Sequence, residues 1–262
     1  MIEFHQLAAA LYLAAGIGAL VGLVLPSPRM NRGARWGLVL GAVVQAFAFA
    51  TLHRVEAPSI TSLPVVLASS AWMTVVFAML LTTRVRLPGL AAVVGPMAFV
   101  SVFVASLGWN AGGELSLIEA GPWPHVHVLL ASGGLALLGI AGLAGLFFLL
   151  EHRRLKAKPP VASRVRLPSL EALDRVNVVT TTVGFTMLSL GIVTGMAWLK
   201  QTQGSAWMGT SHEAWMVISW AIYLGLVCAR FAGRQGARQA AASALAGFAF
   251  LLFGIVGVGV MG

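Results

Sequence analysis

The chain has 262 residues, of which 58% are hydrophobic and only 10% are charged. Soluble domains carry about 25% charged residues, so a polar surface cannot cover this chain and lipid must surround most of it. The formal net charge of +9 does not indicate nucleic-acid binding. The basic residues stand in short clusters between apolar runs, as membrane-flanking cations do.

The N-terminus and the single cysteine limit the remaining classes. The first residues lack the basic region of a secretory signal peptide and carry Glu3 instead, which predicts a retained first helix. Cys228 is the only cysteine. An internal disulfide, a Cys-x-x-Cys thiol carrier and a Cys-x-x-Cys-His covalent haem site are therefore excluded.

Eight apolar segments are long enough to cross the hydrocarbon core, which takes roughly 20 residues per helix. They are continuously apolar rather than alternating, which favours helices over strands. The sequence therefore predicts an all-α integral membrane protein with a single polytopic domain over residues 1–262. The predicted spans are residues 6–25, 36–53, 64–82, 89–108, 127–150, 177–199, 213–230 and 241–261.

Lysine and arginine are distributed unequally between the two sides of this arrangement. Four joints contain all but two of the 17 basic residues, and only Arg54 and Lys200 fall on the other side. The positive-inside rule then places all four joints in the cytoplasm and both termini on the outer side. The four joints are residues 26–35, 83–89, 151–175 and 230–238.

Histidines gather on the predicted outer side. His152 lies in a basic joint, whereas the other five precede or follow predicted spans at the outer face: His5, His53, His125, His127 and His212. Neutral imidazole ligates metals and haem iron, and the side chain is mostly neutral at pH 7. A lone interfacial histidine usually has no such role, so the asymmetry indicates a group of candidate ligands without selecting a pair.

Tryptophans accompany these histidines. Trp109 and Trp123 flank one outer loop, and Trp207 lies in another. An aromatic belt at the membrane interface explains them, and the same rings also suit the wall of a porphyrin pocket. Arg54 and Lys200 are candidate partners for propionates.

Other chemistries have little support in the sequence. No acidic residue pairs with a nucleophile by spacing, and the motifs of serine hydrolases, zinc proteases and P-loop NTPases are absent. Gly37-x-x-x-Gly41 and Gly191-x-x-x-Gly195 indicate close helix–helix approach of a generic kind.

Several stretches resemble the cytochrome c assembly protein family, in its CcsA/HemX-like group. "HVHVLLASGGLALLGIAGLAGLFFLLEHRRLK" is similar to the group's fifth-helix region, with a histidine at its start and a basic end. "LPSLEALDRVNVVTTTVGFTMLSLGIVTGMAW" resembles the next helix, and "SHEAWMVISWAIYLGLVCARFAGRQGARQAAASALAGFAFLLF" resembles the closing pair. "LHRVEAPSITSLPVVLASSAW" is a weaker match to the loop before the third helix.

The resemblance implies an eight-helix haem-handling protein of the bacterial cytoplasmic (inner) membrane. It implies non-covalent haem b, with His127 and His212 as iron ligands and His125 as the alternative to His127. The tryptophan-rich WWD signature is absent, and the second span contains Gln45 and Phe47 where several members have a histidine. The chain therefore resembles a short, HemX-type member.

Three hypotheses follow. The first is a haem-binding protein of cytochrome c assembly or haem trafficking, which holds haem at the outer leaflet through a histidine pair, presents it to assembly partners and need not catalyse a reaction. The second is a HemX-type regulator that contacts glutamyl-tRNA reductase through the basic loop 151–175. The third is a small-molecule transporter, which is disfavoured because the spans carry almost no charges away from their ends and no internal repeat is evident.

Overall fold

The computed structural model describes residues 2–25, 27–52, 62–84, 89–108, 122–157 and 168–261. Within them the chain forms eight helices that are long and apolar enough to span a membrane, which confirms the predicted all-helical membrane architecture. The sidedness of the two termini stays a prediction. The helices are α1 (Ile2–Val24), α2 (Pro28–Leu52), α3 (Leu63–Arg84), α4 (Leu90–Gly108), α5 (Trp123–Lys156), α6 (Leu170–Gln203), α7 (Ser211–Phe231) and α8 (Ala237–Met261).

The helices are longer than the predicted spans at most of their ends. α5 begins four residues before its predicted span, and α6 begins at Leu170 instead of residue 177. Hydropathy reports only the apolar stretch, whereas a helix continues through polar residues until a cap or turn ends it. His5, His125, His127 and His212 consequently lie within the first five residues of their helices and not before them.

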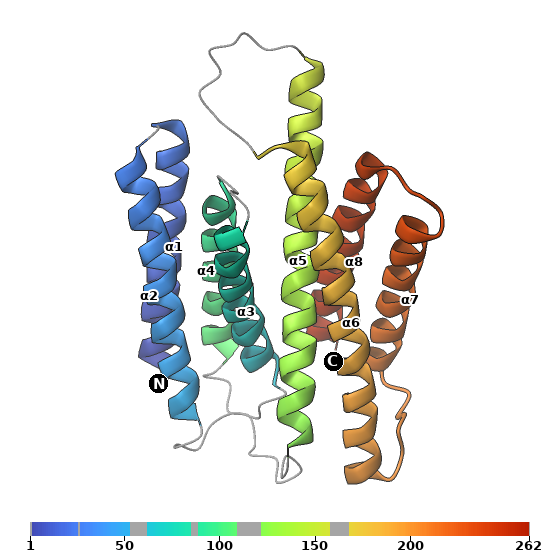
Figure 1. Ribbon diagram of the computed structural model, residues 1–262. Helices are drawn as coiled ribbons and strands as arrows, with labels where there is room; N and C mark the ends of the chain where they lie inside the picture. The colour runs from blue at the N-terminus through green and yellow to red at the C-terminus, as the bar shows by residue number, and fades with distance from the viewer. Residues whose placement is uncertain are drawn as a thin grey trace. The chain divides into compact units, whose positions relative to one another are not determined.

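Contacts divide the chain into two compact units. Unit 1 contains α1 to α4 and unit 2 contains α5 to α8 (Figure 1). Each unit has its own packing, and the single polytopic domain expected from the sequence stays a prediction.

In unit 1, α1 packs against both α2 and α4. A Cβ at Gly37 would stand 3.0 Å from the Cβ of Ala15, and one at Gly41 would stand 2.6 Å from Tyr12. The first glycine motif therefore does allow close approach of α2 to α1. A buried network also connects these helices, since the Tyr12 hydroxyl donates to Gln45 Oε1 at 2.7 Å and Gln45 Nε2 donates to the Ala68 carbonyl at 3.0 Å.

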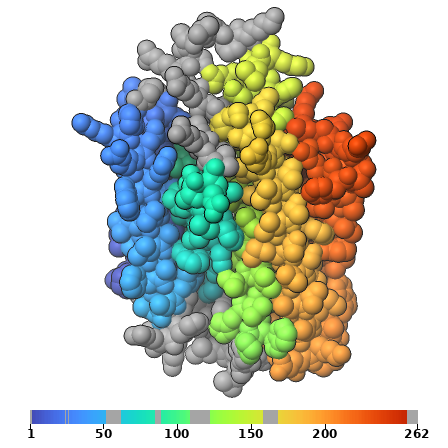
Figure 2. Space-filling model, in the orientation of Figure 1, coloured from blue at the N-terminus to red at the C-terminus, as the bar shows by residue number. Residues whose placement is uncertain are grey.

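In unit 2, α5 is the central helix and runs beside α6 and α8 (Figure 1). Glycines on α5 allow this approach: a Cβ at Gly134 would meet the backbone of Leu188 on α6 at 2.9 Å, and one at Gly145 would meet the carbonyl of Ala241 on α8. The side chains of α6 extend along the face of unit 2 shown in Figure 2. The buried share of the membrane-crossing stretch falls from 72% in α5 to 11% in α7.

Candidate functional site

His127 lies near the start of α5, against α6. Its Nδ1 is 2.8 Å from the carbonyl oxygen of Gly191. Because a carbonyl oxygen can only accept, Nδ1 carries the proton and donates this bond. The neutral ring then keeps its lone pair on Nε2, the nitrogen that remains available for a metal. A hydrogen bond from the other ring nitrogen is the usual way in which proteins fix the tautomer and orientation of a ligating histidine.

One face of α6 is shaped to receive this imidazole. Gly191, Gly195 and Trp198 are spaced at i, i+4 and i+7, so they lie on the same side of the helix. A Cβ at Gly195 would stand 2.8 Å from His127 Nδ1, so only glycine leaves room for the ring there. The indole of Trp198 stacks on the imidazole, with ring centroids 6.4 Å apart and planes inclined by 28°.

The N–H group of the Trp198 indole is a candidate donor to a bound ligand. Its Nε1 atom is buried and makes no hydrogen bond within the described part of the chain. A buried N–H group without an acceptor is costly, and a buried indole N–H usually has a partner. An anionic or carbonyl oxygen of a bound molecule would supply that acceptor beside His127.

His212 lies in the first turn of α7 and is exposed. It is within electrostatic range of His127, so the structure brings these two predicted residues to the same end of unit 2. The neighbouring Glu213 does not orient His212. Both Glu213 carboxylate oxygens accept from the backbone N–H of Met208, at 3.0 and 3.1 Å, and Oε2 also accepts from Thr210 at 3.1 Å.

This arrangement is a capping box, in which the Thr210 hydroxyl reciprocally accepts from the Glu213 N–H. It holds the segment between α6 and α7 in an ordered conformation, with Gly204 and Gly209 at the positive φ angles of 76° and 75° that favour glycine. The buried Glu213 is therefore a structural residue of the candidate site.

The other predicted site residues are either exposed on unit 2, buried in unit 1 or outside the described residues. Trp123 and Trp207 are 39% and 45% exposed, and Lys200 is exposed near the end of α6, so all three suit the interfacial role. His125 is also exposed on α5. His5 is fully buried in unit 1, with its ring edge against Phe49 at 5.3 Å between centroids. His53, Arg54 and Trp109 lie outside the described residues. Residues 158–167 of the basic loop also lie outside them.

The sequence does not assign the Gly191 carbonyl or Gly195 to the candidate site. It does place Trp198, with Trp207, around the loop before the seventh span, where tryptophans suit the wall of a porphyrin pocket. The glycine motif predicts only generic packing, because a sequence does not show which helix lies opposite. The close approach itself is confirmed, since a Cβ at Gly191 would stand 3.2 Å from the Ala131 nitrogen.

Comparison with known proteins supports the resemblance. Cytochrome c biogenesis protein CcsA of Prochlorococcus marinus is 33% identical over 100 residues, which cover 38% of this chain and 31% of the relative. CcsA of Rippkaea orientalis is 27% identical over 153 residues, covering 58% of this chain and 44% of the relative. CcsA of Synechocystis sp. is 29% identical over 128 residues, covering 48% of this chain and 38% of the relative.

The matched regions thus span less than half the length of each of these three relatives. The family model described as Cytochrome C assembly protein matches residues 4–262, nearly the whole chain. The chain belongs to the cytochrome c assembly protein family.

Proposed function

We propose that this protein handles haem for cytochrome c assembly and holds the haem iron through Nε2 of His127. The observation that carries the proposal is the hydrogen bond from His127 Nδ1 to the Gly191 carbonyl, at 2.8 Å. It leaves the Nε2 lone pair for iron and holds the ring in one orientation. Haem iron takes neutral imidazole as an axial ligand.

The second axial ligand in the proposal is His212. It starts α7 at the same end of unit 2 and interacts electrostatically with His127. His125 is a weaker candidate to replace His127. Two positions along an α-helix correspond to a rotation of roughly 200°, so the two side chains leave α5 on nearly opposite sides.

The surroundings of His127 suit a non-covalently bound porphyrin. Trp198 stacks beside the imidazole and has a buried N–H group without an acceptor. Trp123 and Trp207 offer exposed apolar rings, and Lys200 offers a cation for a propionate. Because Cys228 is the only cysteine, the haem is not attached through a Cys-x-x-Cys-His motif, and the proposal takes it as non-covalently bound haem b.

In this role the protein binds and presents haem, and it need not catalyse a reaction. Its relatives carry the name cytochrome c biogenesis protein CcsA, which supports a recipient within cytochrome c assembly. The basic joints support a bacterial cytoplasmic membrane location with the candidate site on the outer side. The regulator and transporter hypotheses stay predictions that no described contact favours.

The test is a haem spectrum of the purified full chain after expression with abundant haem. We expect a Soret band that His127→Ala largely removes and that added imidazole partly restores. His152→Ala is the matched control, because His152 lies on the same helix at its opposite end, stacked on Phe148. A Soret band that is the same in the wild type and in the His127→Ala, His212→Ala double variant would overturn the ligand assignment.

A further inference from the structure

A pocket lies in unit 2 at the end where α6 begins, α7 ends and α8 begins. Its cavity volume is about 20 Å³, enough for one water-sized group, and residues from all three helices line it. One part of its wall is polar, with Asn177, Thr181 and Arg230, and another part is apolar, with Leu226, Val227 and Phe231. The pocket therefore has an amphipathic lining and lies away from His127, towards the opposite end of α6.

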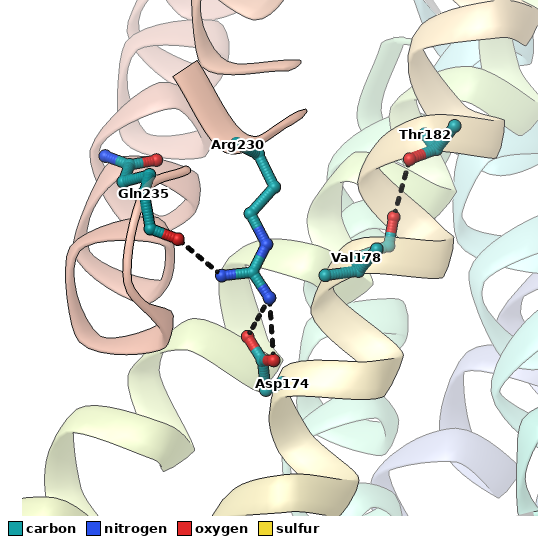
Figure 3. Close-up of polar contacts among 5 residues, drawn as sticks. All are labelled: Asp174, Val178, Thr182, Arg230 and Gln235. Atoms are coloured by element: carbon teal, nitrogen blue, oxygen red, sulfur yellow. Dashed lines mark hydrogen bonds and ion pairs between the residues drawn. The ribbon is translucent and has the colours of Figure 1, made fainter. Parts of the chain in front are cut away.

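Arg230 lines this pocket, and Figure 3 shows its contacts with Asp174 and Gln235. Its Nη2 donates to both carboxylate oxygens of Asp174, at 2.7 and 2.9 Å, and its Nη1 donates to the Gln235 carbonyl at 2.9 Å. These bonds hold the guanidinium in one position, and a guanidinium has further N–H donors beyond the ones used here. Arg230 is thus a prepositioned donor for an additional oxygen ligand.

Thr181 contributes a second available donor. The hydroxyls of Thr180, Thr182 and Thr186 each donate to the carbonyl four residues earlier on α6. Thr181 lines the pocket, and its buried hydroxyl makes no hydrogen bond among the described residues. Because this hydroxyl is not used within the helix as those of its neighbours are, it is left to donate to an oxygen of a bound ligand.

The local charge favours an anion. Asp174 already pairs with Arg230, whereas Arg234 and Arg238 form no ion pair within the described ranges. Arg234 has a φ of 51°, a strained angle for a side chain other than glycine.

The apolar wall indicates where the rest of the ligand lies. α7 is only 11% buried along its membrane-crossing stretch, and Phe231, at the edge of the pocket, is 59% exposed. The pocket thus opens beside an apolar helix surface that is exposed in unit 2. An amphipathic anion from the bilayer fits this arrangement, and basic pockets between membrane helices commonly receive phospholipid headgroups.

The geometry points to a binding site for an anionic phospholipid between α6, α7 and α8. Its phosphate accepts hydrogen bonds from Arg230 and Thr181, and an acyl chain lies against Leu226 and Val227. Arg234 and Arg238 supply the excess positive charge that distinguishes an anionic headgroup from a zwitterionic one. The site does not depend on haem binding at His127.

The first experiment compares ligands on the purified full chain in a neutral detergent. Native mass spectrometry counts bound dioctanoyl phosphatidylglycerol, dioctanoyl phosphatidylcholine or inorganic phosphate at matched concentrations. We expect phosphatidylglycerol to be retained and to raise the Tm, with the other two ligands retained far less. Equal retention of phosphatidylcholine, or displacement of the lipid by inorganic phosphate at similar concentrations, would overturn the proposal.

The second experiment locates the lipid with matched variants. The Asp174→Asn, Arg230→Gln double variant keeps the net charge, and we expect roughly tenfold weaker phosphatidylglycerol binding, the loss typical of one charge-assisted hydrogen bond. The Glu171→Gln, Arg175→Gln double variant is the control, because that ion pair makes the same charge change at the same end of α6 but is exposed and outside the pocket. We expect it to bind like the wild type.

A substitution that fills the apolar wall tests whether the lipid binds in this pocket or is only attracted by surface charge. Val227→Trp leaves every charge in place, and we expect it to weaken phosphatidylglycerol binding to a similar extent. Circular dichroism of each variant in detergent checks that the helices are retained. Equal losses in the two ion-pair variants, or full lipid retention by a folded Val227→Trp protein, would contradict a site in this pocket.

Discussion

His127 on α5 and Gly191 on α6 are joined by a 2.8 Å hydrogen bond between Nδ1 and the carbonyl oxygen. The same carbonyl also accepts from the Thr194 hydroxyl at 3.0 Å. One helix thus supplies the imidazole, and its neighbour determines which nitrogen of the ring carries the proton. The ring orientation consequently depends on how closely α5 and α6 approach, which is set by glycines.

Gly195→Ala tests this dependence. The new Cβ would stand 2.8 Å from Nδ1 and 2.9 Å from Cε1 of His127, so the ring must move and the bond to Gly191 weakens. We expect the Soret absorbance to fall, while the free energy of unfolding changes by less than about 1 kcal/mol because alanine is the better helix former. The measurements are a haem titration and a denaturation curve on the same preparation.

Gly225→Ala is the control for this substitution, since no atom lies within 4 Å of a Cβ at Gly225 on α7. It gains the same helix propensity without touching His127. Equal haem retention by the two variants would show that the packing of α6 does not position the imidazole.

Gln45→Leu in unit 1 removes two buried hydrogen bonds. It leaves the Tyr12 hydroxyl without its acceptor at 2.7 Å and the Ala68 carbonyl without its donor at 3.0 Å. We expect a loss of about 1–3 kcal/mol in unfolding free energy, the cost of orphaned buried polar groups. Adding Tyr12→Phe should recover part of the loss, because the orphaned hydroxyl is then removed as well, and the double-mutant cycle measures this coupling.

Thr74→Val is the comparison for the Gln45 variant. The Thr74 hydroxyl donates only to the Ser70 carbonyl within α3, so its removal affects no contact between helices. A Gln45→Leu protein as stable as Thr74→Val would show that the network does not hold α1, α2 and α3 together.

Asp174→Asn should destabilise the chain more than Glu171→Gln. The Asp174–Arg230 pair is only 26% and 22% exposed and connects α6 with α7, whereas Glu171 and Arg175 are 85% and 69% exposed on one helix. We expect about 1–3 kcal/mol for the first change and at most about 0.5 kcal/mol for the second. Thermal unfolding of both variants in the same detergent compares them, and equal Tm values would contradict the ranking.

Glu213→Ala should release the segment between α6 and α7. The Met208 and Thr210 N–H groups lose their carboxylate acceptor, so hydrogen exchange at these amides should accelerate, with a stability loss of about 1 kcal/mol. Ser169→Ala removes the N-cap of α6, which accepts from the Ala172 N–H, at the other end of that helix. Exchange at Met208 should stay slow in this control, and acceleration in both variants would point to general loosening instead.

The number of membrane-crossing helices and their apolar character can be predicted from the amino-acid sequence. Continuous apolar runs must be helical in lipid, because every backbone N–H and C=O group has to be paired within its own segment. It also pointed to the family and to His127 and His212, because the resemblance depends on local motifs that need no knowledge of packing.

The surroundings of His127 follow only from the tertiary structure. The resemblance selects His127 over His125, but only the placement of α6 shows that Gly191, Gly195 and Trp198 receive its ring. The pairing of Asp174 with Arg230, 56 residues apart, was likewise beyond the sequence. Contacts between helices depend on which faces meet, and hydropathy is nearly uniform around an apolar helix in lipid, so it does not encode the choice of face.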